Sequence, residues 1–314
     1  MYSWLPSKHY KFKETDISYF IYFFVICQQL DFNDLKSTEP KSKVIPSRLK
    51  STLAAPEDAT LPRDNYNVSS TLEGSDACIQ VGIDSLGITS PSTVFHNLTF
   101  QELFDHEVAN EEGQIASTDN GDTFTVDTGK FTGRSPSDKW IVLNKGSASE
   151  GNIDWGSVNQ ATSPEVFDEL YEKAVKYFNN KDKVYVFDCF CGANPNSQKK
   201  VRFVHEMAWQ QHFVTNMFIR PDCKGDIENF EPDFTVINAC SQLNEDWERH
   251  GLNSDVAVVF NIEKKIAVIL GTWYGGENKK GIFSLMNYWL PMADPPQLPM
   301  HCSANVGKDG DTGE

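Results

Sequence analysis

The sequence predicts an α/β fold in which a mixed β-sheet is flanked by helices. Val166, Leu170, Ala174 and Phe178 recur every four residues, which is the spacing of one face of an amphipathic helix. Short apolar segments rich in β-branched residues are typical of strands. Two of these segments form a hairpin pattern and others are joined by longer connections, which together favour a mixed sheet.

The helices have recognisable start signals. Thr99 and Glu102 have the spacing of a capping box, which predicts a helix beginning near Thr99. Ser163 followed by Pro164 is typical of an N-cap and a first helical residue. The other predicted elements are strands at 123–126, 139–143, 183–188, 201–205 and 234–238, a helix at 206–218, and a hairpin of 255–262 with 265–270.

Length and charge restrict the class of protein. A chain of 314 residues corresponds to about two domains. It has 28 basic and 44 acidic residues, a net charge of −16, which disfavours binding to nucleic acid or to anionic lipid through the overall field. An anionic ligand would therefore need a local cationic site.

The first 75 residues differ in composition from the rest. The apolar run Ile17–Cys27 is shorter than the roughly 20 residues that a membrane-spanning helix needs, and no small-residue cleavage site follows it. The basic, serine-containing stretch from Pro40 to Pro56 resembles an organelle transit segment. We expect a disordered extension and linker over 1–75 in a cytoplasmic protein, with organellar targeting, or membrane association through Ile17–Cys27, as alternatives.

Seven scattered cysteines without a C-x-x-C pair indicate reduced thiols in an intracellular protein. Cys189 and Cys191 are predicted to be small buried side chains at the end of a strand, and a metal pair is the alternative.

Three segments could carry chemistry. The first, from Asp127 to Lys139, has two glycines that allow a tight turn and presents Arg134, whose planar guanidinium suits a carboxylate or phosphate. A turn in which Arg134 pairs with Asp138 is the alternative.

The second segment, from Gly271 to Gly281, combines four glycines with Tyr274, Lys279 and Lys280 just before a predicted helix at Ile282–Leu290. This arrangement suggests an anion site at a helix N-terminus, although adjacent lysines are also common as a solvated pair. The third segment, from Met300 to Gly307, places His301 on a predicted strand that enters a glycine-containing turn, where a structural role is the alternative.

Taken together and in order, these segments resemble the ATP-dependent phosphoenolpyruvate carboxykinase family. The resemblance covers roughly Phe95 to Asp311 and includes the segments TGKFTGRSPSDKW, FCGANP, VRFVHEMAWQQHFVTNMFIRP, GLNS, GTWYGGENKKG and HCSANVGKDGD. It implies the fold of the family's N-terminal domain over 76–311. It also implies conversion of oxaloacetate and ATP to phosphoenolpyruvate, CO2 and ADP in gluconeogenesis, with Mg2+ on the nucleotide and Mn2+ at the substrate.

The resemblance also implies residue roles. Arg134 would bind a substrate carboxylate, and Tyr274 would contact the substrate near the reacting carbon. Lys280 and His301 would ligate Mn2+ and approach the transferred phosphoryl group, and Lys280 would also contact substrate. Lys279 would neutralise phosphate charge. A lysine ligates a metal only as the neutral amine, so the adjacent ammonium of Lys279 would assist by lowering the pKa of Lys280.

One departure from the family is clear in the sequence. No G-x-x-x-x-G-K-[ST] phosphate loop occurs in the 314 residues, so the C-terminal nucleotide-binding domain and the third Mn2+ ligand are expected to be absent. We therefore expect one nearly complete domain behind an extension, with little or no turnover by this chain alone. A non-catalytic anion-binding fragment or interaction protein derived from the enzyme is the alternative.

Overall fold

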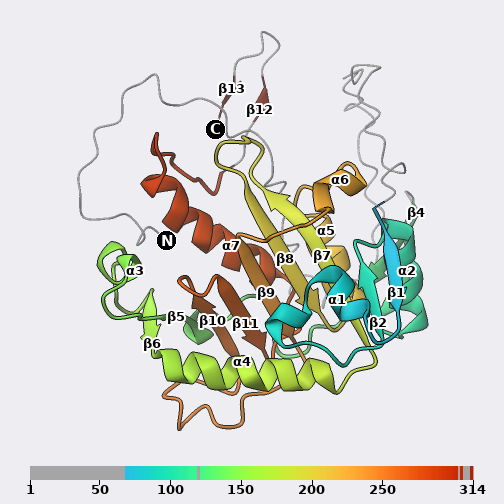
Figure 1. Ribbon diagram of the computed structural model, residues 1–314, viewed down its shortest axis with the longest axis horizontal. Coiled ribbons are helices and arrows are strands. Elements are labelled where there is room, and N and C mark those ends of the chain that lie inside the picture. Colours follow the sequence, from blue (N-terminus) through green and yellow to red (C-terminus); the bar gives the residue numbers. More distant parts are fainter. Residues whose placement is uncertain (1–67, 119–120, 303–304, 307–311, 314) are drawn as a thin grey trace, which may run out of the picture. The chain divides into compact units, whose positions relative to one another are not determined.

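The computed structural model describes residues 68–118, 121–302, 305–306 and 312–313. They fall into two units, each described by itself. The first is the body of the chain up to His301, and the second contains a short antiparallel ribbon of β12 (Asn305–Val306) and β13 (Thr312–Gly313). The body is built on a nine-stranded sheet with helices on both faces (Figure 1). The predicted α/β class is confirmed.

The sheet is mixed, as predicted. Its strand order is β1-β2-β7-β8-β9-β11-β10-β5-β6. The pairs β1–β2, β7–β8 and β10–β11 are antiparallel, and the other five neighbouring pairs are parallel. The strands are β1 (Ser70–Glu73), β2 (Thr93–His96), β5 (Lys139–Val142), β6 (Gln160–Thr162), β7 (Lys183–Cys191), β8 (Lys199–His205), β9 (Phe234–Ala239), β10 (Ala257–Asn261) and β11 (Ile266–Leu270).

The other elements of the body surround this sheet. A separate antiparallel ribbon is formed by β3 (Gln114–Thr118) and β4 (Gly121–Thr125). The helices are α1 (Ala77–Val81), α2 (Phe100–Ala109), α3 (Ala148–Asn152), α4 (Pro164–Asn179), α5 (Ala208–Thr215), α6 (Lys224–Ile227) and α7 (Gly276–Trp289). Helix α2 begins with the predicted capping box of Thr99 and Glu102.

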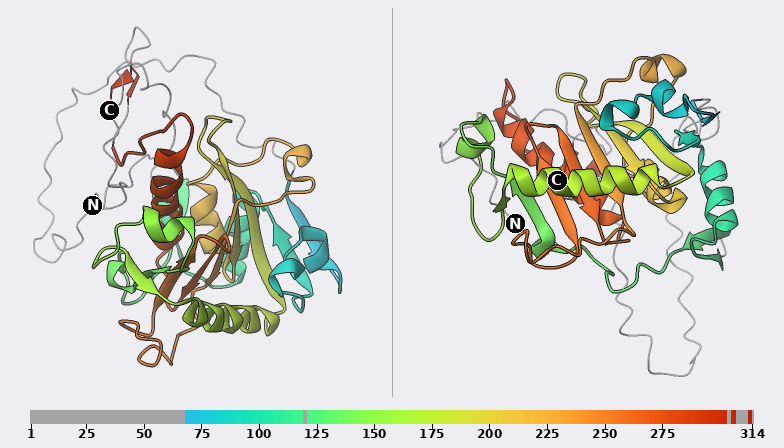
Figure 2. Two further views of the ribbon diagram at one scale, coloured as in Figure 1. Left: turned by 60° about the vertical axis from the view of Figure 1, so that its left-hand side comes forward. Right: turned by 60° about the horizontal axis from the view of Figure 1, so that its bottom comes forward.

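Helix α4 covers one face of the sheet (Figure 2). It begins as predicted, since the Ser163 hydroxyl accepts a hydrogen bond from the backbone N–H of Val166 at 3.3 Å. Its apolar stripe is buried against every second residue of the strands because successive strand side chains alternate between faces. This core contains Phe167, Leu170, Ala174 and Phe178 of the helix and Val186, Val204, Ile237, Val259 and Val268 of the sheet.

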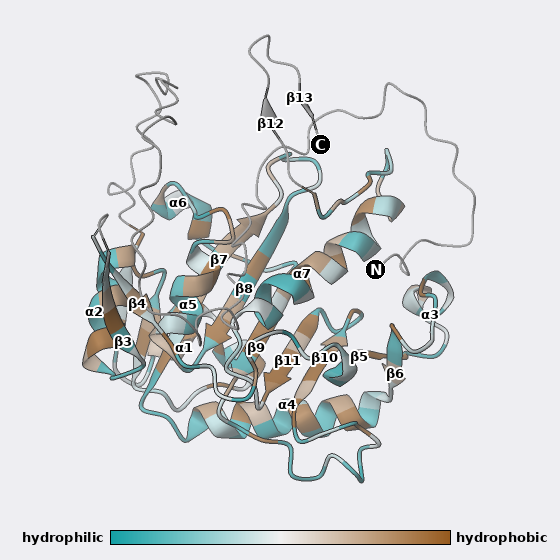
Figure 3. Cartoon of the chain, turned by 180° about the vertical axis from the view of Figure 1, so that it is seen from behind, coloured by the Kyte–Doolittle hydropathy of each residue, from teal (hydrophilic) through white to brown (hydrophobic). Residues whose placement is uncertain are grey.

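Helices α5 and α7 cover the opposite face, which Figure 3 shows from behind. The strand residues that point away from α4 pack here, so β5 and the five strands from β7 to β11 contribute to both cores. This second core contains Val214 of α5, Ile282, Leu285 and Met286 of α7, and Phe187, Phe203, Val236, Phe260 and Ile269 of the sheet. These contacts fix helix α7 on the sheet, and the first turn of the helix contains the polar residues Glu277, Asn278 and Lys279.

A charged cluster is buried between β2, β7 and β8. The Arg202 guanidinium contacts both oxygens of Asp188, with Nε–Oδ1 at 2.7 Å and a terminal nitrogen to Oδ2 at 2.8 Å. His96 Nε2 lies 3.0 Å from Asp188 Oδ2. Although burial opposes ionisation, these partners hold the pKa of Asp188 below its usual range. The carboxylate is thus satisfied inside the core.

The described cysteines are free thiols. Cys189 is buried in the core of α5 and α7, as predicted, and Cys191 follows it on the same strand face. Burial raises the pKa of the Cys191 thiol to about 12, which keeps it protonated. In the part of the chain that the structure describes, no three or more His, Cys, Asp or Glu side chains are grouped to hold a metal.

Two predicted boundaries differ from the structure. Strand β1 lies within residues predicted to be linker, so the folded body begins before residue 76. Helix α5 is shorter than the predicted 206–218, because Met207 is its extended N-cap and the chain leaves the helix after Thr215. Ile17–Cys27 and the basic stretch from Pro40 to Pro56 lie outside the described residues, among which no helix is long and apolar enough to cross a membrane.

Candidate active site

The loop that carries Arg134 joins β4 to β5. Asp127 Oδ1 accepts the backbone N–H of Gly129 at 2.8 Å, and Gly129 has a φ of 67°, which a glycine adopts without strain. The loop ends at Ser135, whose backbone N–H donates to Glu277 Oε1 at 2.6 Å. Arg134 is exposed beside this bond, which connects its loop to the first turn of α7.

The alternative for Arg134, a turn closed by pairing with Asp138, is not what the structure shows. The Asp138 carboxylate instead accepts hydrogen bonds from the hydroxyls of Ser135 and, at 2.8 Å, Ser254. Asn253 also donates to the Ser137 carbonyl at 2.6 Å. The GLNS segment therefore holds the turn after Arg134, and among the described residues no ion pair joins Arg134 to Asp138.

The glycine-rich segment before α7 is fixed by close packing. A Cβ at Gly276 would overlap the Tyr274 ring, so the tyrosine folds back over the helix start. A Cβ at Gly275 would lie 2.9 Å from atoms of both Trp209 and Phe213 of α5. These two glycines allow α5 and Tyr274 to approach the backbone directly.

Hydrogen bonds between buried side-chain amides hold the same segment in place. Gln210 donates to the Trp273 carbonyl at 2.8 Å and accepts from the Asn278 amide at 2.9 Å. Asn238 of β9 donates to Asn278 Oδ1 at 3.1 Å. Each of the three amides is fully buried, so the loop with Tyr274 and the first turn of α7 rest on a connected hydrogen-bond network.

Lys279 and Lys280 lie inside α7, which corrects the prediction that they precede the helix. The helix begins at Gly276, and Glu277 and Asn278 are buried in its first turn. The Lys280 amine lies 3.3 Å from both ring nitrogens of His301 and 4.8 Å from the centre of the Phe283 ring. His301 itself lies in no strand, contrary to prediction.

The electrostatics show that the predicted cations share one site. Burial, followed by the charges of Lys279 and Arg134, lowers the pKa of Lys280 to about 8. Burial and the charges of Lys280, Lys279 and Arg134 likewise lower the pKa of His301. Four side chains from three separate segments are therefore close enough to repel one another's protons.

The sequence analysis missed two members of this site, Lys139 and Glu277. Lys139 begins β5, and its Nζ lies 3.4 Å from the Ser284 hydroxyl of α7. Burial and the charge of Arg134 lower its pKa. Burial raises the pKa of Glu277, although Ser135, Arg134 and Lys139 oppose that shift. Both residues lie in the segments that suggested the site, but a charge beside a glycine-rich turn normally suggests solvent exposure.

The residues present fit a divalent metal in part. Lys280 and His301 offer two nitrogen donors, and both lowered pKa values favour the neutral forms that ligate metals. Their contact shows that the two donors converge on one point. Among the described residues, no group of three or more His, Cys, Asp or Glu side chains could complete such a site by itself. Beyond metal binding, the arrangement suits an anion, since Arg134, Lys139 and Lys279 supply positive charge.

Comparison with known proteins shows the family of this chain. The family model described as phosphoenolpyruvate carboxykinase matches residues 92–313, which include every residue of the site. A phosphoenolpyruvate carboxykinase (ATP) of Campylobacter lari is 57% identical over 230 residues, which cover 73% of this chain and 42% of that protein.

Relatives from other bacteria are similarly close. Proteins of the same name from Sulfurimonas denitrificans and Leptospira biflexa are each 52% identical to this chain, cover 73% and 74% of it, and are matched over 42% of their own length. The chain thus spans less than half the length of these relatives. The family match covers most of the chain and contains the whole cationic site, so the chain belongs to the phosphoenolpyruvate carboxykinase family.

Proposed function

We propose that the body of this chain is the substrate-binding domain of an ATP-dependent phosphoenolpyruvate carboxykinase. The observation that carries the proposal is the convergence of Arg134, Lys279, Lys280 and His301 at the first turns of α7. The substrate would be oxaloacetate, and the products would be phosphoenolpyruvate, CO2 and ADP. Such a dianion needs local positive charge in a chain whose net charge is −16.

The reaction has two bond changes that this site would assist. Cleavage of the bond to the departing carboxylate releases CO2 and leaves its electron pair on an enolate. The enolate oxygen then attacks the γ-phosphorus of ATP, and ADP leaves. Positive groups placed beforehand stabilise the charge that develops in each step.

The side chains have distinct proposed roles. Arg134 binds a substrate carboxylate through its guanidinium, and Tyr274 contacts the substrate near the reacting carbon. Lys279 neutralises phosphate charge. Lys280 and His301 hold Mn2+ as neutral nitrogen donors and approach the phosphoryl group of ATP, whose own cation is Mg2+. When bound, Mn2+ would supply Lewis-acid stabilisation of the charge that develops on the substrate.

Calorimetric titration with oxalate, an analogue of the enolate, tests the proposal. Oxalate should bind the purified chain, and Mn2+ should increase its affinity. Arg134→Ala should weaken oxalate binding at least tenfold. Arg249→Ala, which changes an exposed arginine paired with Glu169 of α4, should leave oxalate binding unchanged. Absence of oxalate binding, or equal binding by both variants, would overturn the proposal.

A turnover assay separates the enzyme from the second candidate, a non-catalytic anion-binding protein. The observation that favours this candidate is the group of positive side chains Arg134, Lys139 and Lys279, which suits binding of an anion without any turnover. Oxaloacetate and ATP are supplied with both metals, and phosphoenolpyruvate is measured. Oxalate binding without detectable turnover supports the anion-binding candidate for this chain, and turnover at rates typical of enzymes supports the carboxykinase.

A further inference from the structure

The carboxylate of Glu277 lies close enough to Arg134 and Lys139 to feel the charge of both. Glu277 is the second residue of α7 and is 4% exposed. Its Oε1 atom accepts the backbone N–H of Ser135 at 2.6 Å, the residue directly after Arg134. A single side chain therefore connects the Arg134 loop to the turn of α7 that also carries Lys279 and Lys280.

The surroundings of this carboxylate both oppose and favour its charge. Burial and the charge of Asp138 raise the pKa of Glu277, whereas the N-terminal turn of the helix and the cations Arg134 and Lys139 favour the negative form. Burial of the same group is costly unless its hydrogen bonds are made. The short bond to Ser135 is a charge-assisted hydrogen bond of the strong class. Moving the loop away from α7 would break this hydrogen bond and leave the buried carboxylate without its partner.

A second link lies beside the first. Lys139 begins β5 only four residues after Ser135, and its amine reaches the Ser284 hydroxyl two turns along α7. The loop is thus anchored to α7 at Ser135 and to the sheet at Lys139. The Arg134 side chain is exposed and makes no hydrogen bond or ion pair with the other described residues, so the position of its backbone depends on Ser135.

We propose that Glu277 is a positioning residue that sets the separation between Arg134 and the lysine pair by holding the Ser135 backbone. The inference rests on the proposed function, because that separation determines which anion can bridge the loop and the helix. Displacement of one charged partner by about 1 Å is enough to cost a bound substrate much of its orientation. Glu277 touches no substrate in this proposal and acts through Arg134.

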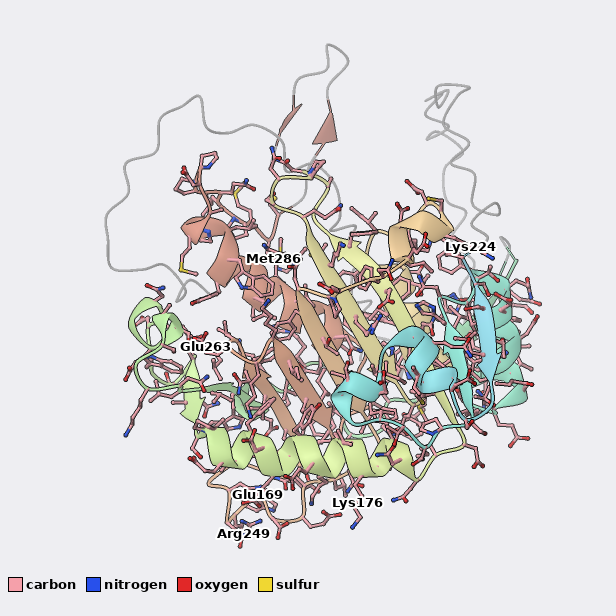
Figure 4. All side chains as sticks on the ribbon, viewed as in Figure 1. Glu169, Lys176, Lys224, Arg249, Glu263 and Met286 are labelled. Carbon is pink, nitrogen blue, oxygen red and sulfur yellow. The ribbon has the colours of Figure 1, made fainter. Side chains whose placement is uncertain are left out.

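Two substitutions distinguish position from charge. Glu277→Gln removes the charge but keeps a carbonyl oxygen at the same reach, so it can still accept from Ser135. Glu277→Asp keeps the charge but shortens the side chain by one methylene, so it cannot reach. Glu263 offers a matched control, since it also accepts a backbone N–H, that of Ser149 at 3.3 Å, at the remote position labelled in Figure 4.

Two readouts are measured on the full chain. Hydrogen exchange of the peptide around Ser135 should be at least tenfold faster in Glu277→Asp than in the wild type, and within threefold of wild type in Glu277→Gln. The oxalate dissociation constant should rise at least tenfold in Glu277→Asp and less than threefold in Glu277→Gln. Glu263→Asp and Glu263→Gln should change neither readout.

The outcomes that overturn the inference are specific. A larger effect of Glu277→Gln than of Glu277→Asp would show that charge, not position, is what matters. Equal exchange at Ser135 in all variants would show that the bond does not hold the loop. Failure of the wild type to bind oxalate overturns the proposed function instead, and the exchange data then decide the positioning role by themselves.

If Glu277→Asp does not fold, the same bond can be removed from the loop side. Ser135→Pro deletes the N–H donor and also draws φ from −104° toward about −65°, whereas Ser135→Ala removes only the hydroxyl. Ser135→Pro should weaken oxalate binding at least tenfold relative to Ser135→Ala. Equal binding by the two variants would overturn the inference.

Discussion

At the residue scale, the amine of Lys280 is the group most changed by its surroundings. Its pKa of about 8 follows from burial and from the charges of Lys279 and Arg134. Removing either neighbouring charge should raise that pKa toward the ordinary value of 10.5. The pH dependence of Lys280 acetylation, followed by mass spectrometry, measures the pKa in Lys279→Gln and Arg134→Ala. Mn2+ affinity should rise with pH up to about 8, because only the neutral amine ligates.

The control for this prediction is a lysine far from the site. Lys176 is exposed on α4, which covers the opposite face of the sheet from α7. Lys176→Gln should leave the pKa of Lys280 unchanged. If Lys279→Gln and Arg134→Ala also leave it unchanged, the two charges are not the cause of the shift.

The buried pair of Arg202 and Asp188 should be costly to break from one side. Arg202→Met leaves a fully buried carboxylate without its main partner, so the free energy of unfolding should fall by about 3–5 kcal/mol. Urea denaturation measures it. The double variant Asp188→Leu with Arg202→Met should lose less than the single one, since no uncompensated charge remains. A loss below about 1 kcal/mol in Arg202→Met would contradict this account.

At the scale of elements, α7 depends on a glycine that allows contact with the sheet. A Cβ at Gly281 would lie 2.7 Å from the tip of the Phe260 ring on β10. Helix propensity alone would make Gly281→Ala stabilising by about 0.5–1 kcal/mol. The clash should reverse that sign and destabilise the protein by about 1–3 kcal/mol, because the packed core cannot give way. Thermal and urea unfolding measure the change.

Gly151 provides the matched control for the predicted loss of stability. It lies within α3, and a Cβ there would meet nothing within 4 Å. Gly151→Ala should therefore be neutral or stabilising. Should Gly281→Ala prove as stable as Gly151→Ala, the contact with Phe260 does not limit the position of α7.

The elements also show what the sequence could and could not predict. Helix α4, with its apolar residues four positions apart, and the β-branched hairpin of β10 and β11 follow from local patterns, and both were predicted. The start of α7 was placed too late because Gly275, Gly276 and adjacent charges are typical of a loop. Only the tertiary packing of Trp209 and Phe213 against Gly275 shows why the helix begins there.

The same limit applies to the site. Arg134, Lys279, Lys280 and His301 could be selected because their types suit an anion, and the structure brings them together. Glu277 could not, since a carboxylate beside two lysines is ordinarily solvated and paired along the helix. Its burial and its bond to Ser135 join segments that are 142 residues apart, which no local pattern contains.

At the scale of the whole molecule, one sheet supplies both cores. Because adjacent residues of β7 to β11 point to opposite faces, neither α4 nor α7 can detach without exposing strands that the other helix also covers. The ion pair of Arg249 with Glu169, labelled in Figure 4, lies on the exposed side of α4 and adds little to this coupling. We therefore expect the body of the chain to unfold in one cooperative transition.

Matched leucine substitutions test this coupling. Leu170 of α4 and Leu285 of α7 are buried on opposite faces, at 0% and 1% exposure, so each change to alanine should cost about 2–5 kcal/mol. Both variants should show one shared midpoint by far-UV circular dichroism and by tryptophan fluorescence. Leu298→Ala, at a residue that is 50% exposed, should change stability by less than about 0.5 kcal/mol. Separate midpoints in either buried variant would show that the two layers fold independently, and α7 could then move with its cationic site while α4 stayed in place.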